Sequence, residues 1–392
     1  MTQPAKKRIA FLLPPGYAGE FIKSFVQAMP AGVDVEIIPR SKLGMPRVGL
    51  SMWRAFSWSD AIARCTHAWR VRKTPEYFFR FLKAIIQAPL YFARHYRTVA
   101  DYDAVVIFNG FRYNQMTAAM AARDLGVQTI YCELGFFPGT LIFDPKGINY
   151  GNSLPRDIAD YPPADDEAYD VYEELRSRLK ARQSKKALQQ KAIKLPEKYI
   201  FVPFQVDVDS QIAFYSPWIK DMEALFEALE KLTPYLPEGW AFVLKEHPER
   251  IVDYSHLRAR ADGEKMIFAN GNDSVELMKN ASGLLTINSS MGVQGLLFDY
   301  PVITVGQSCY SFPGLAEHAG SLADSIDLIK HIDRLPVDRE ARVRFIGYTQ
   351  KHYLLPASLS DPLSPESAEK VRQQFTEFLG LERSEAYTKV GS

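Results

Sequence analysis

The stretch that decides the fold is AVVIFNGFRYNQMTAAMAARDLGVQTIYC, residues 104–132. Ala104 to Phe108 is a short apolar run of the kind found in buried strands. The Ala- and Met-rich segment Gln115 to Leu125 predicts a helix, which Gly126 ends. Val127 to Cys132 predicts a second strand. A strand, a helix and a strand in this order predict a parallel, doubly wound sheet with helices on its faces.

The same alternation extends to both sides of this stretch. Arg8 to Leu13 and Val33 to Ile38 are expected strands, with the turn-rich loop 14–19 after the first. The alternation restarts after residue 195, with expected strands at Tyr199 to Pro203, Trp240 to Lys245, Gly283 to Ile287 and Pro301 to Val305, and expected helices at Lys220 to Leu232, Ser274 to Lys279 and Gly292 to Phe298. Two such sheets predict a cleft between the carboxyl ends of their strands.

The chain has 392 residues, which is more than one hydrophobic core usually spans. We therefore expect an N-terminal Rossmann-like domain over residues 1–190 and a C-terminal one over 195–340. Helices in 341–392 are expected to pack back on the N-terminal domain. The charged stretch 165–194 predicts a surface linker helix between the two halves.

Composition narrows the class of protein. Apolar residues make up 47% and charged residues 24%, as in soluble globular proteins rather than disordered ones. The net charge of +1 gives no support to a nucleic-acid partner. Three cysteines without a Cys-x-x-Cys spacing disfavour a disulfide framework or a zinc site. The apolar stretch near the N-terminus is too short for a signal sequence, so a cytoplasmic location is expected.

The segment 41–97 is basic and aromatic. It holds eleven Lys or Arg residues against the two acids Asp60 and Glu76, with Trp, Tyr and Phe interleaved. Such a mixture predicts peripheral contact with the anionic inner face of the cytoplasmic membrane. The alternative is a helical layer of the first domain with a solvated basic face.

Two polar clusters that contain carboxylates follow predicted strands, where catalytic residues of open α/β sheets gather. Glu133, with Gly135 after it, is placed as a general acid or base, although it could instead be a turn or cap residue. The loop after residue 203 carries Gln205, Asp207 and Asp209. Its carboxylates could bind a metal, act as nucleophile, or cap the next helix.

Two further clusters have the chemistry of a phosphate site. Lys245-Glu246-His247-Pro248 follows a strand, and proline restrains the backbone of the histidine before it. Asn288-Ser289-Ser290 precedes a helix, where hydroxyl and N–H groups bind anions or simply cap the helix. The P-loop, G-x-G-x-x-G, H-E-x-x-H and G-x-S-x-G motifs are absent from the sequence, which disfavours the NTPases, dehydrogenases, metalloproteases and hydrolases that carry them.

The order Glu133-x-Gly135, His247-Pro248, Ser289-Ser290 resembles that of bacterial CMP-sugar transferases. More of the chain is similar to capsule-synthesis β-Kdo transferases of the KpsS/LipB type, which are related to KpsC/LipA. The segments that carry this resemblance are Asn109-Gly110-Phe111-Arg112, Glu133 to Pro138, Gly147-Ile148-Asn149, Ser153 to Arg156 and Pro203 to Ile212.

The resemblance implies two Rossmann-like domains facing a cleft, the GT-B-like architecture, with an N-terminal acceptor domain and a C-terminal donor domain. It also implies that a lipid or glycan acceptor receives Kdo from CMP-β-Kdo with retention, without a metal or other cofactor. Retention by double displacement needs a nucleophile, for which the resemblance singles out Asp209. Glu133 would act on the acceptor hydroxyl and His247 on the departing CMP.

The remaining residues that we expect to bind substrates are Gln205, Asp207, Arg112, Lys245, Pro248, Asn288, Ser289, Ser290 and Gly135. Two other functions stay open at this point. Asp207-Val208-Asp209 is formally an Asp-x-Asp motif, which would suit a metal-dependent transferase of nucleotide-diphosphate sugars. A non-catalytic, membrane-associated scaffold for polysaccharide assembly would explain the basic aromatic segment but not the polar clusters.

Overall fold

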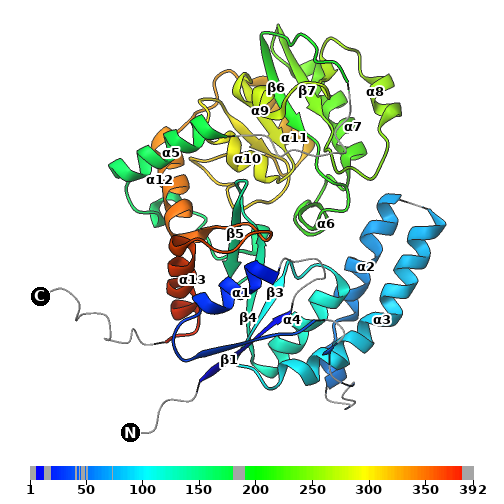
Figure 1. The fold of residues 1–392 in the computed structure, drawn as a ribbon. Coiled ribbons are helices and arrows are strands. Elements are labelled where there is room, and N and C mark those ends of the chain that lie inside the picture. The colour runs from blue at the N-terminus through cyan, green and yellow to red at the C-terminus, as the bar shows by residue number, and fades with distance from the viewer. Residues whose placement is uncertain are drawn as a thin grey trace, which may run out of the picture.

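The protein has two α/β lobes in the computed structural model, which describes residues 6–12, 19–39, 42–43, 45, 49, 52–72, 74–179 and 190–381 (Figure 1). Each lobe contains a six-stranded sheet. The predicted fold class, two Rossmann-like domains of GT-B-like arrangement, is confirmed. Residues 14–18 of the predicted loop 14–19 lie outside the described residues, as do parts of the segment 41–97 and the ends of the chain, whereas Gly19 begins a helix.

The first sheet is mixed rather than fully parallel. Its strands, in spatial order, are β12 (Leu354–Pro356), β5 (Thr140–Asp144), β4 (Gln128–Leu134), β3 (Ala104–Phe108), β1 (Lys7–Leu12) and β2 (Val33–Ile37). The four strands from β4 to β2 are parallel, but β5 runs antiparallel to β4, and β12 antiparallel to β5. The expectation of a purely parallel sheet was therefore wrong at this edge, because a turn of five residues joins β4 directly to β5 without a crossover helix.

Alternating side chains of this sheet bury two different helical layers. Ile9, Phe11 and Phe143 pack with residues of α1 (Gly19–Ala28) and α13 (Pro365–Phe378). Ala10 and Val105 point the other way, into a core shared with α2 (Trp58–Arg72), α3 (Pro75–Val99) and α4 (Tyr113–Leu125). This period of two is what a sheet covered on both faces requires.

The second sheet is parallel throughout, as expected. Its strands, in spatial order, are β11 (Glu317–His318), β10 (Val302–Thr304), β9 (Gly283–Thr286), β6 (Lys198–Pro203), β7 (Trp240–Lys245) and β8 (Met266–Phe268). The helices of this lobe are α6 (Ser210–Tyr215), α7 (Met222–Leu232), α8 (Ser255–Arg260), α9 (Ser274–Lys279), α10 (Ser290–Gly295) and α11 (Leu322–Lys330).

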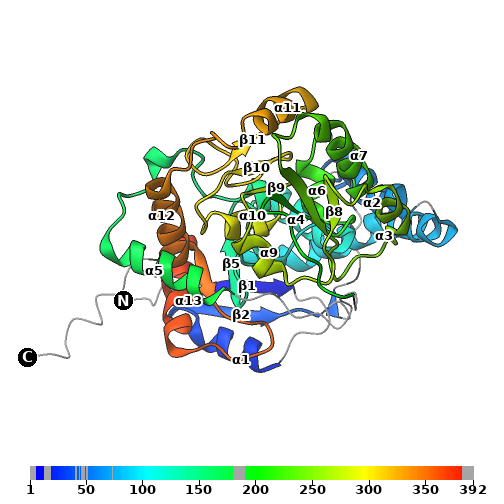
Figure 2. The same ribbon diagram turned by 90° about the horizontal axis from the view of Figure 1, so that it is seen from above.

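The two lobes are joined twice by the chain. α5 (Asp166–Arg178) packs against α12 (Arg339–Tyr348), which leads through a π-helical turn (Thr349–Tyr353) to β12 and α13 on the first lobe. Figures 1 and 2 show α5 and α12 together on one side of the molecule, with α2 and α3 on the other. The predicted linker helix 165–194 is shorter than expected, because the helix ends at Arg178 and residues 180–189 lie outside the described part.

The helices that the structure describes include none that is both long and apolar enough to cross a membrane.

A buried arginine anchors α12 to the second lobe. Arg342 is 2% exposed, and its guanidinium donates to the carbonyl oxygens of Phe298 (2.6 Å), Tyr300 (3.0 Å) and Leu315 (3.4 Å). Burial lowers the pKa of Arg342 from its ordinary value. Two of these carbonyls belong to the turn after α10 and the third to the segment before β11, so one side chain fixes how the crossing helix sits on the second domain.

Replacing this arginine should destabilise the fold. Arg342→Met removes the arginine donor from three carbonyl groups, of which only that of Phe298 keeps another donor among the described residues, the N–H of Tyr300. We expect the free energy of unfolding to fall by about 3 kcal/mol in denaturant titration. Arg339→Met on the same helix is the matched control. Its ion pair with Glu173 is half exposed, so a loss of at most about 1 kcal/mol is expected. Equal losses in the two variants would contradict the anchoring role.

Candidate functional site

Three loops of the second lobe meet at one edge of its sheet. β9, β6 and β7 are neighbouring parallel strands, so the loops that follow them emerge side by side at their carboxyl ends. These loops begin near Ile287, Phe204 and Glu246. The sequence clusters around Gln205, His247 and Ser289 are therefore brought to the same edge.

Gln205 and Asn288 support this edge from inside. They are 4% and 1% exposed, and each side chain hydrogen-bonds the other, with Gln205 Nε2 donating to Asn288 Oδ1 at 3.1 Å. Asn288 Nδ2 also donates to the carbonyl oxygens of Gln211, Tyr215 and Gln307. In this structure both amides hold α6 in place rather than face a cleft.

Asp207 is also turned inward. It is 2% exposed, and its carboxylate accepts hydrogen bonds from the Tyr254 hydroxyl and, at 3.4 Å, from the N–H of Met222. Burial raises the pKa of Asp207, against the hydrogen bonds that lower it. Asp209, two residues later, has different partners, so the two carboxylates of the Asp-x-Asp motif are engaged separately.

The Lys245–Pro248 segment is tied to its neighbours. The Lys245 ammonium donates to the carbonyl oxygens of Asn270 (2.7 Å) and Asn272 (2.6 Å), and burial lowers its pKa. Half-buried Pro248 keeps His247 extended, and His247 Nδ1 accepts the N–H of Glu249 at 3.0 Å. The neutral ring consequently carries its proton on Nε2, which is then a hydrogen-bond donor.

Glu246, between these residues, organises the loop. It is 5% exposed and its carboxylate is bound by Arg250, by Arg258 and by the Asn270 amide, at 2.8, 2.5 and 2.9 Å. This buried carboxylate, with its two arginine partners, fixes the loop around the histidine.

The Ser289-Ser290 turn begins α10. Ser289 is the N-cap, and its Oγ accepts the N–H of Met291 at 3.2 Å, while its carbonyl accepts the Tyr310 hydroxyl at 2.5 Å. A Cβ on Gly292 would lie 2.0 Å from that hydroxyl, so glycine is needed for this packing. Ser290 is half-buried at the start of the helix.

In the first lobe, Glu133 lies on β4 with its carboxylate held. Oε2 accepts a hydrogen bond from Asn109 Nδ2, and Oε1 accepts the N–H of Leu134 at 2.8 Å. Asn109 has the left-handed φ of 60° that asparagine tolerates, and its Oδ1 accepts the N–H of Phe111 at 3.0 Å. Gly135 is buried, and a Cβ there would lie 2.0 Å from Thr140 Oγ1, so only glycine fits at this position.

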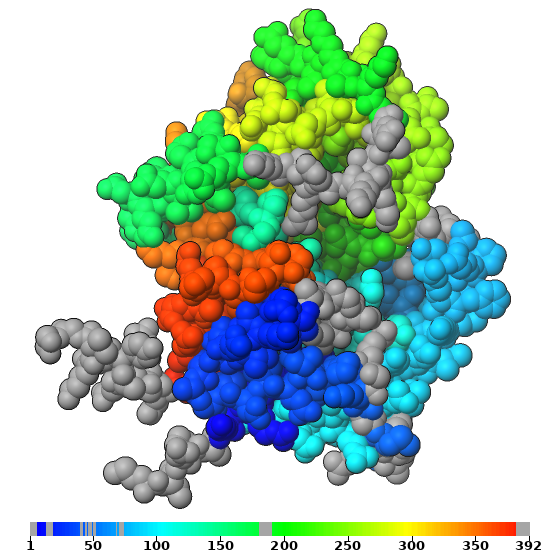
Figure 3. Space-filling model, viewed as in Figure 1, coloured from blue at the N-terminus to red at the C-terminus, as the bar shows by residue number. Residues whose placement is uncertain are grey.

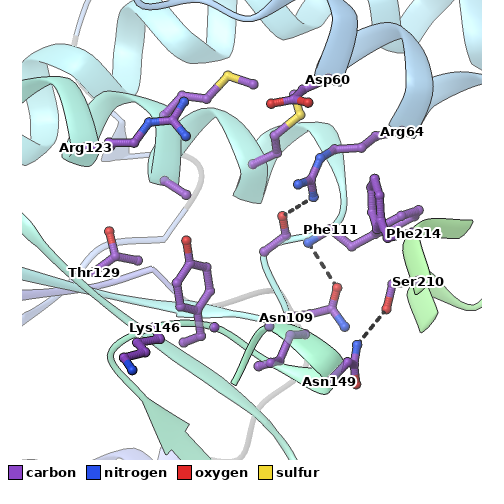
Figure 4. Close-up of a pocket in the computed structure, with 18 of the residues that line it drawn as sticks. Asp60, Arg64, Asn109, Phe111, Arg123, Thr129, Lys146, Asn149, Ser210 and Phe214 are labelled. Carbon is purple, nitrogen blue, oxygen red and sulfur yellow. Dashed lines mark hydrogen bonds between the residues drawn. The ribbon is translucent and has the colours of Figure 1, made fainter. Parts of the chain in front are cut away.

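A cavity of about 420 Å³ opens beside this pair, between the face of β4 and the loop after β5 (Figure 4). The first lobe contributes Asn109, Tyr131 and the loop 145–151, and α6 of the second lobe contributes Ser210, Phe214 and Tyr215. Asn149 Nδ2 donates to Ser210 Oγ at 3.3 Å, so the wall of the cavity is continuous across the two domains.

Asp209 stands at this junction as the N-cap of α6. Its Oδ1 accepts the N–H of Gln211 at 2.9 Å and lies 3.4 Å from the Ser210 hydroxyl. Burial raises the pKa of the Asp209 carboxyl, while these two hydrogen bonds act to lower it. A half-buried carboxylate with a raised pKa beside a cavity is typical of functional sites.

The cavity is lined by three cations, Arg64, Arg123 and Lys146, and by one acid, Asp60 (Figure 4). Arg64 donates to the Gly110 carbonyl at 3.0 Å and lies over the Phe214 ring at 4.3 Å. This balance of charge favours an anionic group on whatever the cavity binds. The predicted Arg112 is not part of the lining; it is exposed at the start of α4.

Sequence reasoning missed these three cations. Lys146 follows an unexpected strand, and Arg123 sits in the last turn of a helix. Arg64 belonged to the segment that we had assigned to lipid or to solvent. The sequence did contain one signal for the cavity wall. Side chains alternate between the two faces of a strand, so Thr129 and Tyr131, which line the cavity, lie on the same face of β4 as Glu133.

Comparison with known proteins gives a consistent picture. Residues 166–326 match the family model described as capsule polysaccharide biosynthesis protein. The protein FixF of Sinorhizobium fredii is 36% identical over 264 residues, which is 67% of this chain. The match spans 63% of the length of FixF.

A weaker likeness in sequence points the same way. The capsule polysaccharide export protein KpsS of Escherichia coli is 22% identical over 274 residues, covering 55% of this chain and 70% of that protein. The solved structure of Thermosulfurimonas dismutans KpsC, a beta Kdo 2,7 transferase, is 19% identical with a TM-score of 0.43, covering 65% of this chain and 79% of that one. This structural likeness is too low to transfer an activity. The resemblance to capsule proteins that the sequence predicted is confirmed by the family model and by the match to KpsS.

Proposed function

The chain is related to the capsule polysaccharide biosynthesis proteins. We propose that it is a retaining glycosyltransferase that moves Kdo from CMP-β-Kdo to a lipid or glycan acceptor. One observation carries the proposal. Asp209 begins α6, and the next residue, Ser210, lines the same cavity as Asn109, the hydrogen-bond partner of Glu133. Two carboxylates from different domains are thus each attached to a residue that lines the same cavity, Glu133 by a hydrogen bond and Asp209 as a chain neighbour.

The second lobe is the donor domain in this proposal. CMP carries a single phosphate, which the Nε2–H of His247 and the hydroxyls of Ser289 and Ser290 bind at the edge formed by β9, β6 and β7. Glu246 and Pro248 fix the histidine, and Gln205, Asn288 and Lys245 hold the surrounding loops. Their burial and hydrogen bonds support this division between contact and support.

The first lobe holds the acceptor in the cavity. Arg123 and Lys146, which have no hydrogen bond or ion pair from their side chains within the described residues, bind an anionic group of the acceptor. The face of β4 orients the acceptor hydroxyl toward Glu133. The cavity is polar enough for a sugar or a headgroup and too small for a long glycan, so only the reacting end enters.

Double displacement follows from these positions. An oxygen of Asp209 attacks the anomeric carbon of Kdo, and the bond from that carbon to the phosphate oxygen breaks, so CMP leaves with the electron pair. The acceptor hydroxyl then attacks the same carbon and passes its proton to Glu133. The bond to Asp209 breaks, and two inversions give net retention.

The nucleophile can be tested by trapping. Asp209→Asn should lower the rate of CMP release from CMP-Kdo about a thousandfold or more. Glu133→Gln should accumulate the adduct, so mass spectrometry should find one Kdo on the peptide that contains Asp209.

The matched control is Asp221→Asn. Asp221 is likewise an N-cap in the second lobe, accepting the N–H of Ala224 at 2.8 Å, but neither of its chain neighbours lines the cavity. Asparagine caps a helix about as well as aspartate, so both variants should stay folded and only Asp209→Asn should abolish transfer. An adduct elsewhere, or equal losses of activity, would count against this nucleophile.

The raised pKa of Asp209 predicts the acid limb of the pH profile. The nucleophile must be ionised, so kcat/KM should fall as pH falls through a midpoint above the ordinary aspartate value of about 3.9. Ser210→Ala removes a hydrogen bond that favours the ionised form, and the midpoint should therefore move to higher pH. A midpoint that stays in place would show that another group titrates.

A metal is not part of this mechanism, because departure of CMP requires neutralising one phosphate only. Activity should survive dialysis against EDTA and should not rise when Mn²⁺ is added back. Loss of activity that Mn²⁺ restores would instead favour a nucleotide-diphosphate sugar donor, with the Asp207–Asp209 pair reorganised around the ion.

A further inference from the structure

α3 has two opposite apolar faces, although only one is covered. Ala84, Ala88, Phe92, His95 and Val99 recur every three or four residues and are buried against the first lobe. α3 packs there on α4 and on α2. A helix of 25 residues buried on one side would ordinarily be polar on the other.

The outward side of α3 is apolar instead. Phe79, Leu82, Ile86 and Leu90 follow one another at helical spacing and are 67%, 37%, 75% and 43% exposed. At 100° per residue this stripe lies opposite the buried face. Seven of the thirteen exposed large apolar side chains in the described residues lie on α2 and α3, so the feature is local. The pair of helices α2 and α3 projects from the body of the molecule in Figure 3.

Cations flank the stripe. Lys83 and Arg97 are exposed, and Arg94 is half-buried, on the side of the helix next to Phe79 and Leu90. One acid shares this side of α3: Glu76 lies one turn before Phe79 and pairs with Arg80 at 2.6 Å. Asp60 of α2 lines the cavity. From Lys83 to Arg97 the margin of the apolar surface is therefore positive.

We propose that this face of α3 lies on an anionic lipid bilayer. The stripe would enter the boundary between headgroups and acyl chains, and Lys83, Arg94 and Arg97 would reach lipid phosphates, as long basic side chains do at interfaces. The stripe is a convex ridge on one helix rather than a groove, which suits a deformable lipid surface better than a folded protein partner.

Docking of α3 on the bilayer would also set the position of the cavity relative to the membrane surface. α2 and α4, which pack against α3, supply Arg64 and Arg123 to its lining. The cavity would consequently be held close to the bilayer. The inference does not depend on the transfer reaction, because it concerns adsorption of the folded chain.

Vesicle flotation tests the inference with the full chain. The chain should float with phosphatidylcholine vesicles containing phosphatidylglycerol and should bind pure phosphatidylcholine vesicles much more weakly. Ile86→Asp/Leu90→Asp should reduce the bound fraction at least about tenfold, because two apolar side chains that would enter the bilayer become charged. Lys83→Gln/Arg94→Gln/Arg97→Gln should remove the preference for anionic vesicles.

Tyr235→Asp is the matched control, an exposed aromatic side chain of the second lobe that should bind like the wild type. Circular dichroism and thermal unfolding verify that each variant is folded. Failure of the wild type to float, or equal flotation of Ile86→Asp/Leu90→Asp, would overturn the proposal. A concentration-dependent dimer that the same double variant abolishes, without vesicle binding, would assign the face to a second copy of the chain and would also overturn it.

Discussion

The site depends on one buried carboxylate, Asp144, at the end of β5. It is fully buried, and its oxygens accept the N–H groups of Lys146, Gly147 and Ser153 together with the hydroxyls of Ser153 and Tyr353. A carboxylate away from water needs this many donors. Through them Asp144 shapes the loop that lines the cavity and ties it to the segment returning from the second lobe.

The same loop makes the two domains a single site. Asn149 reaches Ser210 of α6, and on the other side of the seam Gln294 Nε2 donates to the Phe136 carbonyl at 2.8 Å. One hydrophobic core runs from Phe136 and Phe137 into the second sheet at Phe201. Apolar burial therefore holds the lobes together, and a few polar contacts set their register.

Polar residues at the two sheet edges serve different purposes. In the second lobe, Gln205, Asp207 and Glu246 are buried and held by hydrogen bonds and ion pairs, so they fix the loops on which His247 and Ser289 stand. Where the lobes meet, the cavity presents open polar groups and a positive lining. The sequence motifs thus contain residues that would bind substrate and buried residues that hold those side chains in place, because a site needs a rigid frame as well as reactive groups.

The sequence by itself determined the alternation of strands and helices and the gathering of Glu133, His247 and Ser289 at strand ends, because periodicity and strand order are local properties. It also determined that the segment 41–97 is basic and aromatic. Tertiary structure alone decided that β12 pairs antiparallel with β5, and that the Asp207 carboxylate turns to the Tyr254 hydroxyl. Those outcomes depend on partners more than forty residues away, which no local pattern encodes.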